Sequence, residues 1–180
     1  MPQKIDFIMP TTRKVLEFFF ANPTAEFHER EVLRNAKISK GSANRILRRL
    51  ATLSLLDRTE KGRMVFYRLN AGDPFVKQMK VLSNVWALRP FVQGLGESAR
   101  KVTLFGSCAE GTDIAKSDID VLILTDEKRQ AKERVSSFNR KSERQIAPVI
   151  VDMEEFTRMK KEDRPLFERI DRGIALWETA

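Results

Sequence analysis

The stretch "LFGSCAEGTDIAKSDIDVLI", residues 104–123, decides the fold of the second half of the chain. The run "KVTLF", residues 101–105, is short and apolar and ends at Gly106-Ser107, which predicts a buried strand followed by a sharp turn. "SDIDVLILT", residues 117–125, predicts a second strand, and the apolar run at 121–124 indicates burial on both of its faces. Only a short helix fits between the two strands.

Polar side chains at the ends of these two strands form a candidate site. Backbone amides at the start of the short helix, together with the Ser107 hydroxyl, can bind phosphate oxygens. Asp118 and Asp120 are two residues apart, so they lie on the same side of an extended chain. Their mutual repulsion is relieved by a divalent cation, and Mg²⁺ is typically held by one or two carboxylates plus substrate phosphates. The pattern favours phosphoryl or nucleotidyl transfer, and the alternative is a strand end with solvated surface acids.

Residues 104–123 resemble the nucleotidyltransferase superfamily, specifically its minimal (MNT-type) members, and the likeness extends from about residue 98 to the C-terminus. The resemblance implies an α/β fold with a small mixed sheet flanked by helices. It implies Mg²⁺ as cofactor and ATP or another NTP as substrate. It places metal binding at Asp118 and Asp120 and nucleotide binding at Gly106, Ser107, Gly111 and Ser117. In that scheme Gly111 permits close backbone approach, and Ser117 orients the acidic pair.

The match weakens at a third catalytic carboxylate, which active members carry on a later strand. The corresponding strand lies in "RQIAPVIVDMEEF", residues 144–156, and its alignment places Val149 at that position. Asp152 is the alternative candidate, although it also has the position of a cap for the following helix "MEEFTRMKK". General base catalysis is typically worth ~10²–10⁴ in rate. Without it, the site could bind nucleotide and metal yet transfer slowly or not at all.

The first part of the chain shows a different pattern. "PTTRKVLEFFFANP", residues 10–23, and "FHEREVLRNA", residues 27–36, predict two helices, and a third is expected at 40–53 after a turn. "LLDRTEKGRMVFYRLN", residues 55–70, predicts a hairpin that turns at Lys61-Gly62. Three helices followed by a hairpin resemble a winged helix-turn-helix domain.

That resemblance implies binding to double-stranded DNA. The third helix would enter the major groove, and the hairpin would contact the phosphate backbone. The expected contacts are Lys40, Asn44, Arg45 and Arg48 on the helix and Arg58, Lys61 and Arg63 on the hairpin. The charge distribution agrees, because residues 1–73 hold 14 Lys and Arg against 8 Asp and Glu, whereas the whole chain has a net charge of +8. The alternative is a winged helix that mediates protein contacts or dimerisation.

These patterns divide the chain into a winged helix domain at 1–72, a linker helix at 73–97 and a nucleotidyltransferase-like domain at 98–180, an α+β or α/β protein overall. Asp73-Pro74 is a favoured helix start, and Pro90 with the glycines at 94 and 96 is expected to end the linker helix. Its apolar side predicts either a core contact or a homodimer face.

The cysteine content and the hydropathy pattern argue against a disulfide-bonded or membrane-spanning protein. Cys108 is the single cysteine, so the chain has no intrachain disulfide, and we expect a small buried side chain there. No signal peptide and no apolar run near the ~20 residues of a membrane span are visible. These features predict a cytoplasmic protein without a membrane partner. The only histidine, His28, is expected to cap a helix or to lie on the surface.

Three functions follow from these patterns. The chain could transfer a nucleotidyl group to a partner protein, as MNT antitoxins that resemble it modify HEPN-type toxins, while the winged helix regulates transcription of its own operon. It could instead be a DNA-binding regulator whose transferase domain is weakly active, senses nucleotide or dimerises. The third is a structural adaptor that uses neither site.

Overall fold

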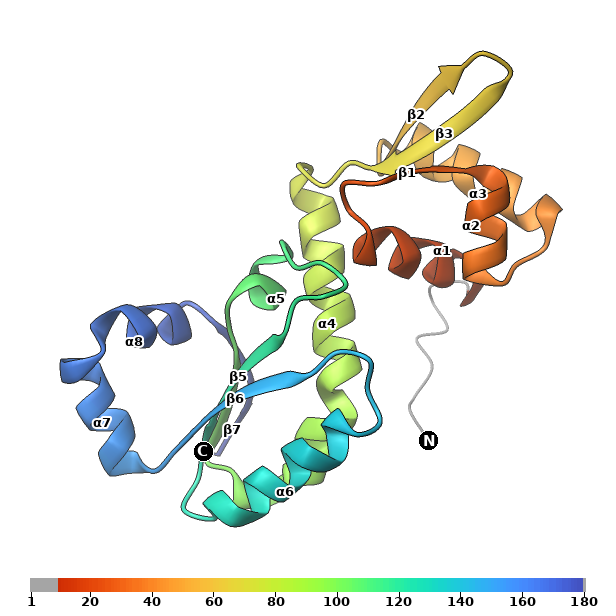
Figure 1. Ribbon diagram of the computed structural model, residues 1–180. Helices are drawn as coiled ribbons and strands as arrows, with labels where there is room; N and C mark the ends of the chain where they lie inside the picture. Colours follow the sequence, from red (N-terminus) through yellow and green to blue (C-terminus); the bar gives the residue numbers. More distant parts are fainter. Residues whose placement is uncertain (1–9, 180) are drawn as a thin grey trace. The chain divides into compact units, whose positions relative to one another are not determined.

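The computed structural model describes residues 10–179, apart from the side chain of Glu97. The chain divides into two compact units at residues 1–77 and 78–180, which we call the N-terminal and C-terminal units (Figure 1). Long helix α4 (Pro74–Leu95) begins at the end of the first unit and belongs mainly to the second.

Three helices form the core of the N-terminal unit: α1 (Pro10–Ala21), α2 (Glu29–Ala36) and α3 (Lys40–Thr52). Their buried side chains recur at helical spacing, so each helix turns one apolar stripe inward. Ser39 caps α3 by accepting the amide of Ser42, and His28 caps α2 by accepting the amide of Arg30. The structure thus gives His28 the capping role expected from its sequence position.

A three-stranded antiparallel sheet completes this unit, in the order β1-β3-β2. The strands are β1 (Glu26–His28), β2 (Leu56–Lys61) and β3 (Met64–Leu69). The β2–β3 hairpin turns where expected, with Gly62 at a φ of +62°. Strand β1 corrects the prediction that residue 27 begins the second helix, because Phe27 pairs with Tyr67 across the sheet. This pairing is not local in sequence, so helical periodicity alone does not reveal it.

Helix α4 follows its predicted range of 73–97, except at Pro90. Asp73 caps it by accepting the amides of Phe75 and Val76, as the Asp-Pro start suggests. Pro90, however, lies inside the helix, which continues to Leu95. Proline removes one helical hydrogen bond, but the buried side chains of Phe91 and Leu95 keep the last turn packed against the C-terminal core.

The C-terminal unit is built on a four-stranded sheet in the order β6-β5-β4-β7. The strands are β4 (Lys101–Leu104), β5 (Ile119–Leu124), β6 (Ile146–Val151) and β7 (Ile174–Glu178). β5 and β6 run parallel and are connected by α6 (Lys128–Asn139), whereas β4 is antiparallel to both of its neighbours. The expected mixed sheet is therefore present.

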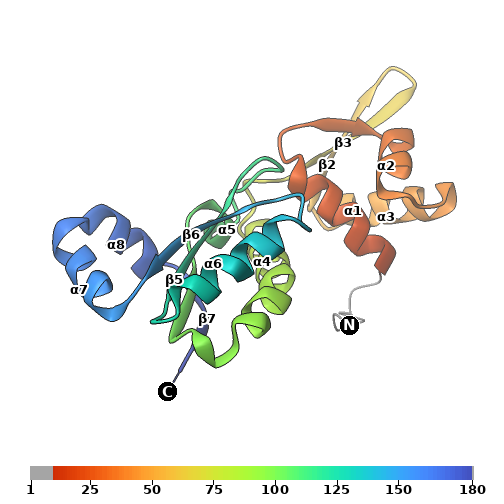
Figure 2. The same ribbon diagram turned by 60° about the horizontal axis from the view of Figure 1, so that its bottom comes forward.

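Helices cover both faces of this sheet (Figures 1 and 2). α4 and α6 pack on the face that carries Val121 and Ile123, and α7 (Met153–Glu162) and α8 (Arg164–Asp171) pack on the face that carries Leu122 and Leu124. All four of these β5 side chains are buried, which explains the unbroken apolar run of this strand. In the described part of the chain, no helix is both long and apolar enough to cross a membrane.

Candidate functional site

The turn after β4 has a backbone geometry that requires glycine. Gly106 adopts a φ of +67° and a ψ of −155°, a region that is essentially closed to other residues. A Cβ atom at this position would collide with the carboxylate of Asp120. The amide of the preceding residue, Phe105, donates to the Asp120 carbonyl at 3.0 Å, so the turn is fixed beside the start of β5. Backbone and carboxylate therefore approach more closely than any side chain would allow.

One turn of helix, α5 (Ser107–Glu110), follows directly. The amides of Ala109 and Glu110 donate to the Gly106 carbonyl, and Ser107 is the first helical residue. Gly111 ends the turn with a φ of +70°, and its amide donates to the Ser107 carbonyl. Gly111 thus forms the helix C-cap, a more local reason for glycine than the predicted close approach to a nucleotide.

Asp118 and Asp120 lie at the start of β5, next to the Gly106 turn. Asp118 is exposed, whereas the Asp120 side chain is 32% exposed. Burial raises the pKa of Asp120 above its ordinary value, the Arg169 guanidinium opposes this rise, and the nearby Asp118 charge adds to it. The two carboxylates are close enough to interact, as their spacing predicts.

Arg169, on α8, is a site residue that the sequence did not suggest. Its Nη2 atom lies 3.7 Å from Asp120 Oδ2, and its guanidinium lies over the Phe105 ring at 5.7 Å from the ring centroid. In sequence, Arg169 is one of many basic residues in the helices that follow β6, and only the tertiary packing of α8 brings it to β5. No local motif could have indicated this contact.

The register of β6 determines which of its residues lies beside the acidic pair. Asp120 pairs with Ala147, whereas Val149 pairs with Leu122, two residues further along the parallel strands. Paired residues of neighbouring strands point to the same face, so Ala147 is the β6 side chain beside the acidic pair. Val149, the residue at the alignment position, lies two residues further along β6, and neither residue is acidic.

Asp152 does not fit the catalytic role considered for it. It follows the last residue of β6, and Ala147 lies five residues earlier, or ~16 Å along an extended chain. Its carboxylate caps α7 by accepting the amide of Glu155 and binds Lys128 at 2.6 Å. The helix amide and the Lys128 ammonium lower the pKa of Asp152. Asp152 is therefore a helix cap.

Ser117 was predicted to orient the two carboxylates, and the structure shows it bonded to residues of the preceding loop and to Arg144. Its hydroxyl accepts the Ile114 amide at 2.9 Å, and its carbonyl accepts Arg144 Nε at 3.2 Å. These bonds close the loop that leads into β5. Ser117 therefore helps to shape the loop that leads to Asp118.

A buried polar network holds the same loop against α4. Asp113, 4% exposed, accepts hydrogen bonds from Lys80 and Asn84 and pairs with Arg144 at 3.0 Å. Burial lowers the pKa of Lys80, while Asp113 opposes the shift. Arg144 also donates to Cys108 Sγ, whose pKa is raised by burial. Cys108 is buried, as expected, and its sulfur additionally serves as an acceptor in this network.

The arrangement fits one divalent ion in the presence of a phosphate ligand. Among residues 10–179, no group of three or more His, Cys, Asp or Glu side chains is placed to hold a metal. Mg²⁺, however, commonly needs only one or two carboxylates when substrate phosphates supply further oxygens. Asp118 and Asp120 provide the carboxylates, and the Gly106 turn lies directly beside Asp120.

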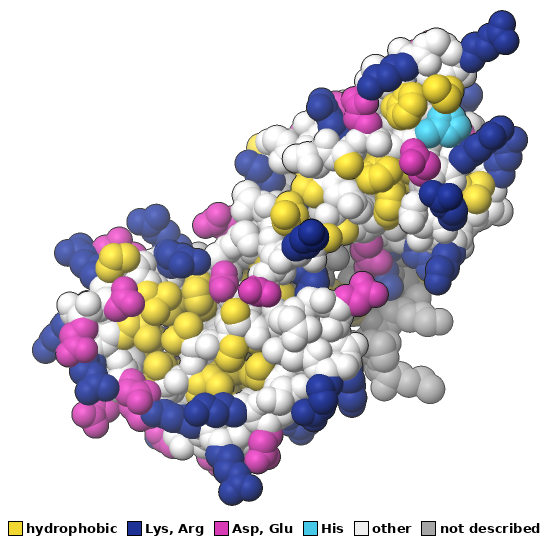
Figure 3. Space-filling view, in the orientation of Figure 1, with side chains coloured by type: hydrophobic (Ala, Val, Ile, Leu, Met, Phe, Trp, Pro, Cys, Tyr) yellow, Lys and Arg dark blue, Asp and Glu magenta, His cyan; other side chains and the backbone are white. Residues whose placement is uncertain are grey.

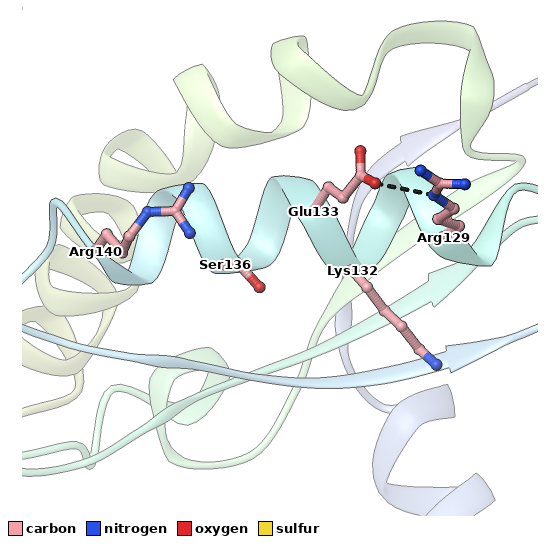
Figure 4. Close-up of a pocket in the computed structure, with 5 residues that line it drawn as sticks. All are labelled: Arg129, Lys132, Glu133, Ser136 and Arg140. Atoms are coloured by element: carbon pink, nitrogen blue, oxygen red, sulfur yellow. Dashed lines mark hydrogen bonds and ion pairs between the residues drawn. The ribbon is translucent and has the colours of Figure 1, made fainter.

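A broad hollow on the C-terminal unit lies away from these residues. It has a volume of about 550 Å³ and is formed along the exposed side of α6 by Arg129, Lys132, Glu133, Ser136 and Arg140 (Figure 4). Arg129 is neutralised in part by Glu133, whose carboxylate lies 3.1 Å away. The hollow is open and lined by solvated charges, as expected for the outer face of a crossover helix.

The predicted DNA contacts of the N-terminal unit differ in their intramolecular partners. On α3, Lys40, Arg45 and Arg48 are exposed, whereas Asn44 donates to Glu29 at 2.8 Å. Arg45 also lines a hollow of about 440 Å³ beside α1. Blue side chains surround the β2–β3 hairpin in Figure 3.

On the hairpin, two of the three predicted phosphate contacts have intramolecular partners. Arg58 pairs with Glu60 at 2.6 Å, and Lys61 pairs with Glu26. Arg63, next to the turn, is exposed. Of the predicted DNA contacts, Arg63 and the three exposed α3 residues are thus the best placed to meet an external anion.

A family model agrees with the geometry of the C-terminal unit. The model of the nucleotidyltransferase domain family matches residues 87–176, which is half of the chain. A crystal structure of a protein from Sulfolobus solfataricus, described as a candidate nucleotidyltransferase, is 19% identical. It covers 57% of this chain and 86% of its own, with a TM-score of 0.38. No curated protein matches the chain. By the family match, the chain belongs to the nucleotidyltransferase domain family.

Proposed function

We propose that the C-terminal unit binds an NTP with Mg²⁺ and transfers its nucleotidyl group to an acceptor hydroxyl. The observation that carries this proposal is the contact between the Gly106 turn and the Asp120 carboxylate, which only glycine permits. A phosphate placed on this turn lies next to the acidic pair. Asp118 and Asp120 would hold the ion, which when bound neutralises phosphate charge.

The residues of the site suggest how transfer would proceed. The amides of the Gly106 turn and the Ser107 hydroxyl would hold the triphosphate. The acceptor oxygen would form a bond to the α-phosphorus as the bond to the departing pyrophosphate breaks. Because Ala147 lies beside Asp120 where a carboxylate could accept the acceptor proton, this proton would pass to solvent. We therefore expect slow transfer, reduced by some of the ~10²–10⁴ that a general base contributes.

We further propose a protein hydroxyl as acceptor, on the basis of the resemblance to MNT antitoxins, with a HEPN-type toxin as the partner class. The test supplies each of the four NTPs, labelled at the α-phosphate, with Mg²⁺ and the product of the neighbouring gene. We expect label on protein with the wild type and none with Asp118→Asn or Asp120→Asn. Absence of both transfer and Mg·NTP binding with all four nucleotides would contradict the proposal.

A second function, DNA binding by the N-terminal unit as a winged helix, is favoured by the exposed basic residues of α3. Such binding should weaken steeply with salt, because each phosphate contact releases counterions. We expect Arg45→Glu and Arg48→Glu to abolish retardation of DNA in a gel. Arg34→Glu, which makes the same charge change on α2, is the matched control and should retain most binding. Equal losses in all three variants would indicate only a general charge effect.

A further inference from the structure

Arg169 occupies a position between the two halves of the candidate site. Its Nη2 atom is 3.7 Å from Asp120 Oδ2, and it would be 3.3 Å from a Cβ atom built on Gly106. A cation therefore lies beside both the acidic pair and the turn that we propose as the phosphate site. Arginine suits such a position, because its planar guanidinium binds carboxylates and phosphates with the same fork of donors.

The packing of α8 fixes the backbone of Arg169 but leaves its guanidinium exposed. Ile170 is 3% exposed and packs with Phe105 and Leu122 in the core. Just beyond the helix, a Cβ atom on Gly173 would lie 2.6 Å from the Leu104 carbonyl oxygen, so α8 and β4 approach closely. The Arg169 side chain itself is 59% exposed. The helix is thus anchored while the guanidinium can exchange partners.

The charges of the site favour movement of the guanidinium from Asp120 to phosphate when ligands bind. In the structure, Arg169 is the cation that pairs with Asp120. A divalent ion on the acidic pair would repel the guanidinium and replace it as counterion. A triphosphate on the Gly106 turn would offer new anionic oxygens within a short movement of the same side chain.

We propose that Arg169 is an exchangeable counterion, which pairs with Asp120 in the nucleotide-free protein and moves to the triphosphate when Mg·NTP binds. The proposal rests on the function proposed above for the same site. It makes Arg169 a substrate-binding residue that also competes with the free metal ion. These two roles have opposite consequences when the side chain is removed.

The test measures two dissociation constants of Arg169→Ala. Without nucleotide, Mn²⁺ should bind about two- to fivefold more tightly, because an exposed competing ion pair has been removed. Mg·ATP should bind roughly tenfold more weakly, because a charge-assisted hydrogen bond to phosphate is lost. Electron paramagnetic resonance of free Mn²⁺ gives the first constant, and calorimetry gives the second. Arg169→Lys, which keeps the charge and loses the fork, should fall between wild type and Arg169→Ala in both.

Arg164→Ala is the matched control, because it removes the same charge from α8 at a residue whose partner is Glu168. Both constants should stay near the wild-type values. The proposal is overturned if Arg169→Ala leaves the Mn²⁺ constant unchanged, if both constants move in the same direction, or if the control shows the same pattern. Melting curves establish that each variant is folded. If Arg169→Ala does not fold, the same two constants are measured for Arg169→Lys.

The two proposals fail in different ways. If the wild type binds no Mg·ATP, the proposed function fails together with the role of Arg169 in phosphate binding. If the wild type binds Mg·ATP and Arg169→Ala binds it equally well, only the role of Arg169 fails.

Discussion

Gly106 is the residue at which backbone conformation and chemistry meet. Its positive φ and its contact with the Asp120 carboxylate leave no space for a Cβ atom. We expect Gly106→Ala to cost about 1–3 kcal/mol of unfolding free energy from backbone strain. Because the collision involves Asp120, Mg·ATP binding should fall as well. Denaturant titration and calorimetry measure the two effects.

Gly62→Ala provides the comparison for Gly106→Ala. Gly62 has a similar φ of +62°, but no atom lies within 4 Å of the place that a Cβ atom would take. Backbone strain alone should therefore lower its stability without weakening nucleotide binding. Normal Mg·ATP affinity in Gly106→Ala would contradict the proposed phosphate site.

Asp120 is expected to reduce stability when it is ionised. Burial raises its pKa from the ordinary 3.8, so the folded state holds the proton more tightly than the unfolded state does. Stability from this group is present at low pH and is lost as the pH rises through the folded pKa. Asp120→Asn should therefore raise the unfolding free energy at neutral pH, by less than about 1 kcal/mol given the partial exposure.

The pH dependence distinguishes this cause from others. The gain from Asp120→Asn should be complete at neutral pH and vanish as the pH falls to the ordinary carboxyl range. Thermal melts between acidic and neutral pH measure this dependence. A gain that persists at low pH would mean that repacking, and not charge, stabilises the variant.

Individual site residues were predictable from sequence to different degrees. Ser107, Asp118 and Asp120 could be placed because a strand, a glycine turn and a second strand are encoded within one short stretch. Arg169 could not, since its contact depends on how α8 packs more than forty residues later. The hydrogen bond from Asn44 to Glu29 was likewise not evident from sequence, whereas the role of Asn44 in DNA binding stays a prediction.

At the scale of elements, sequence patterns located most helices and strands but not their register. β7 lies at 174–178, where a short apolar run follows α8 and Gly173. The pairing of Asp120 with Ala147 depends on the crossover through α6 and on contacts between parallel strands, which leave no local signal. Sequence alone therefore could not show which β6 residue lies beside Asp120.

Helix α7 provides a direct test of the role of Asp152. Its carboxylate forms a capping box with Glu155 and an ion pair with Lys128. Asp152→Ala should lower the melting temperature, whereas Asp152→Asn should keep most of the stability, since asparagine is also a good N-cap. Mg·ATP binding should be unchanged in both variants. A loss of nucleotide transfer in Asp152→Asn, with the fold intact, would restore the catalytic role.

At the scale of the whole molecule, the two units carry different chemistry. Lys and Arg exceed Asp and Glu by 14 to 8 in residues 1–73, whereas the acidic pair and the Gly106 turn belong to the C-terminal unit. Both tryptophans, Trp86 and Trp177, lie in the C-terminal unit, so tryptophan fluorescence reports its unfolding. The two proposed functions can therefore be followed separately in the intact protein.

We expect single substitutions to remove one function and preserve the other. Mg·ATP at about 100 times its dissociation constant should stabilise the wild type by ~2.7 kcal/mol, seen as a rise in the tryptophan melting temperature. Asp118→Asn should lose this rise and still retard DNA, whereas Arg48→Glu should keep the rise and lose the retardation. If Arg48→Glu also loses the nucleotide shift, the functions are coupled through the chain. If neither ligand has an effect on the wild type, both proposed functions are contradicted, and the structural adaptor is the hypothesis that remains.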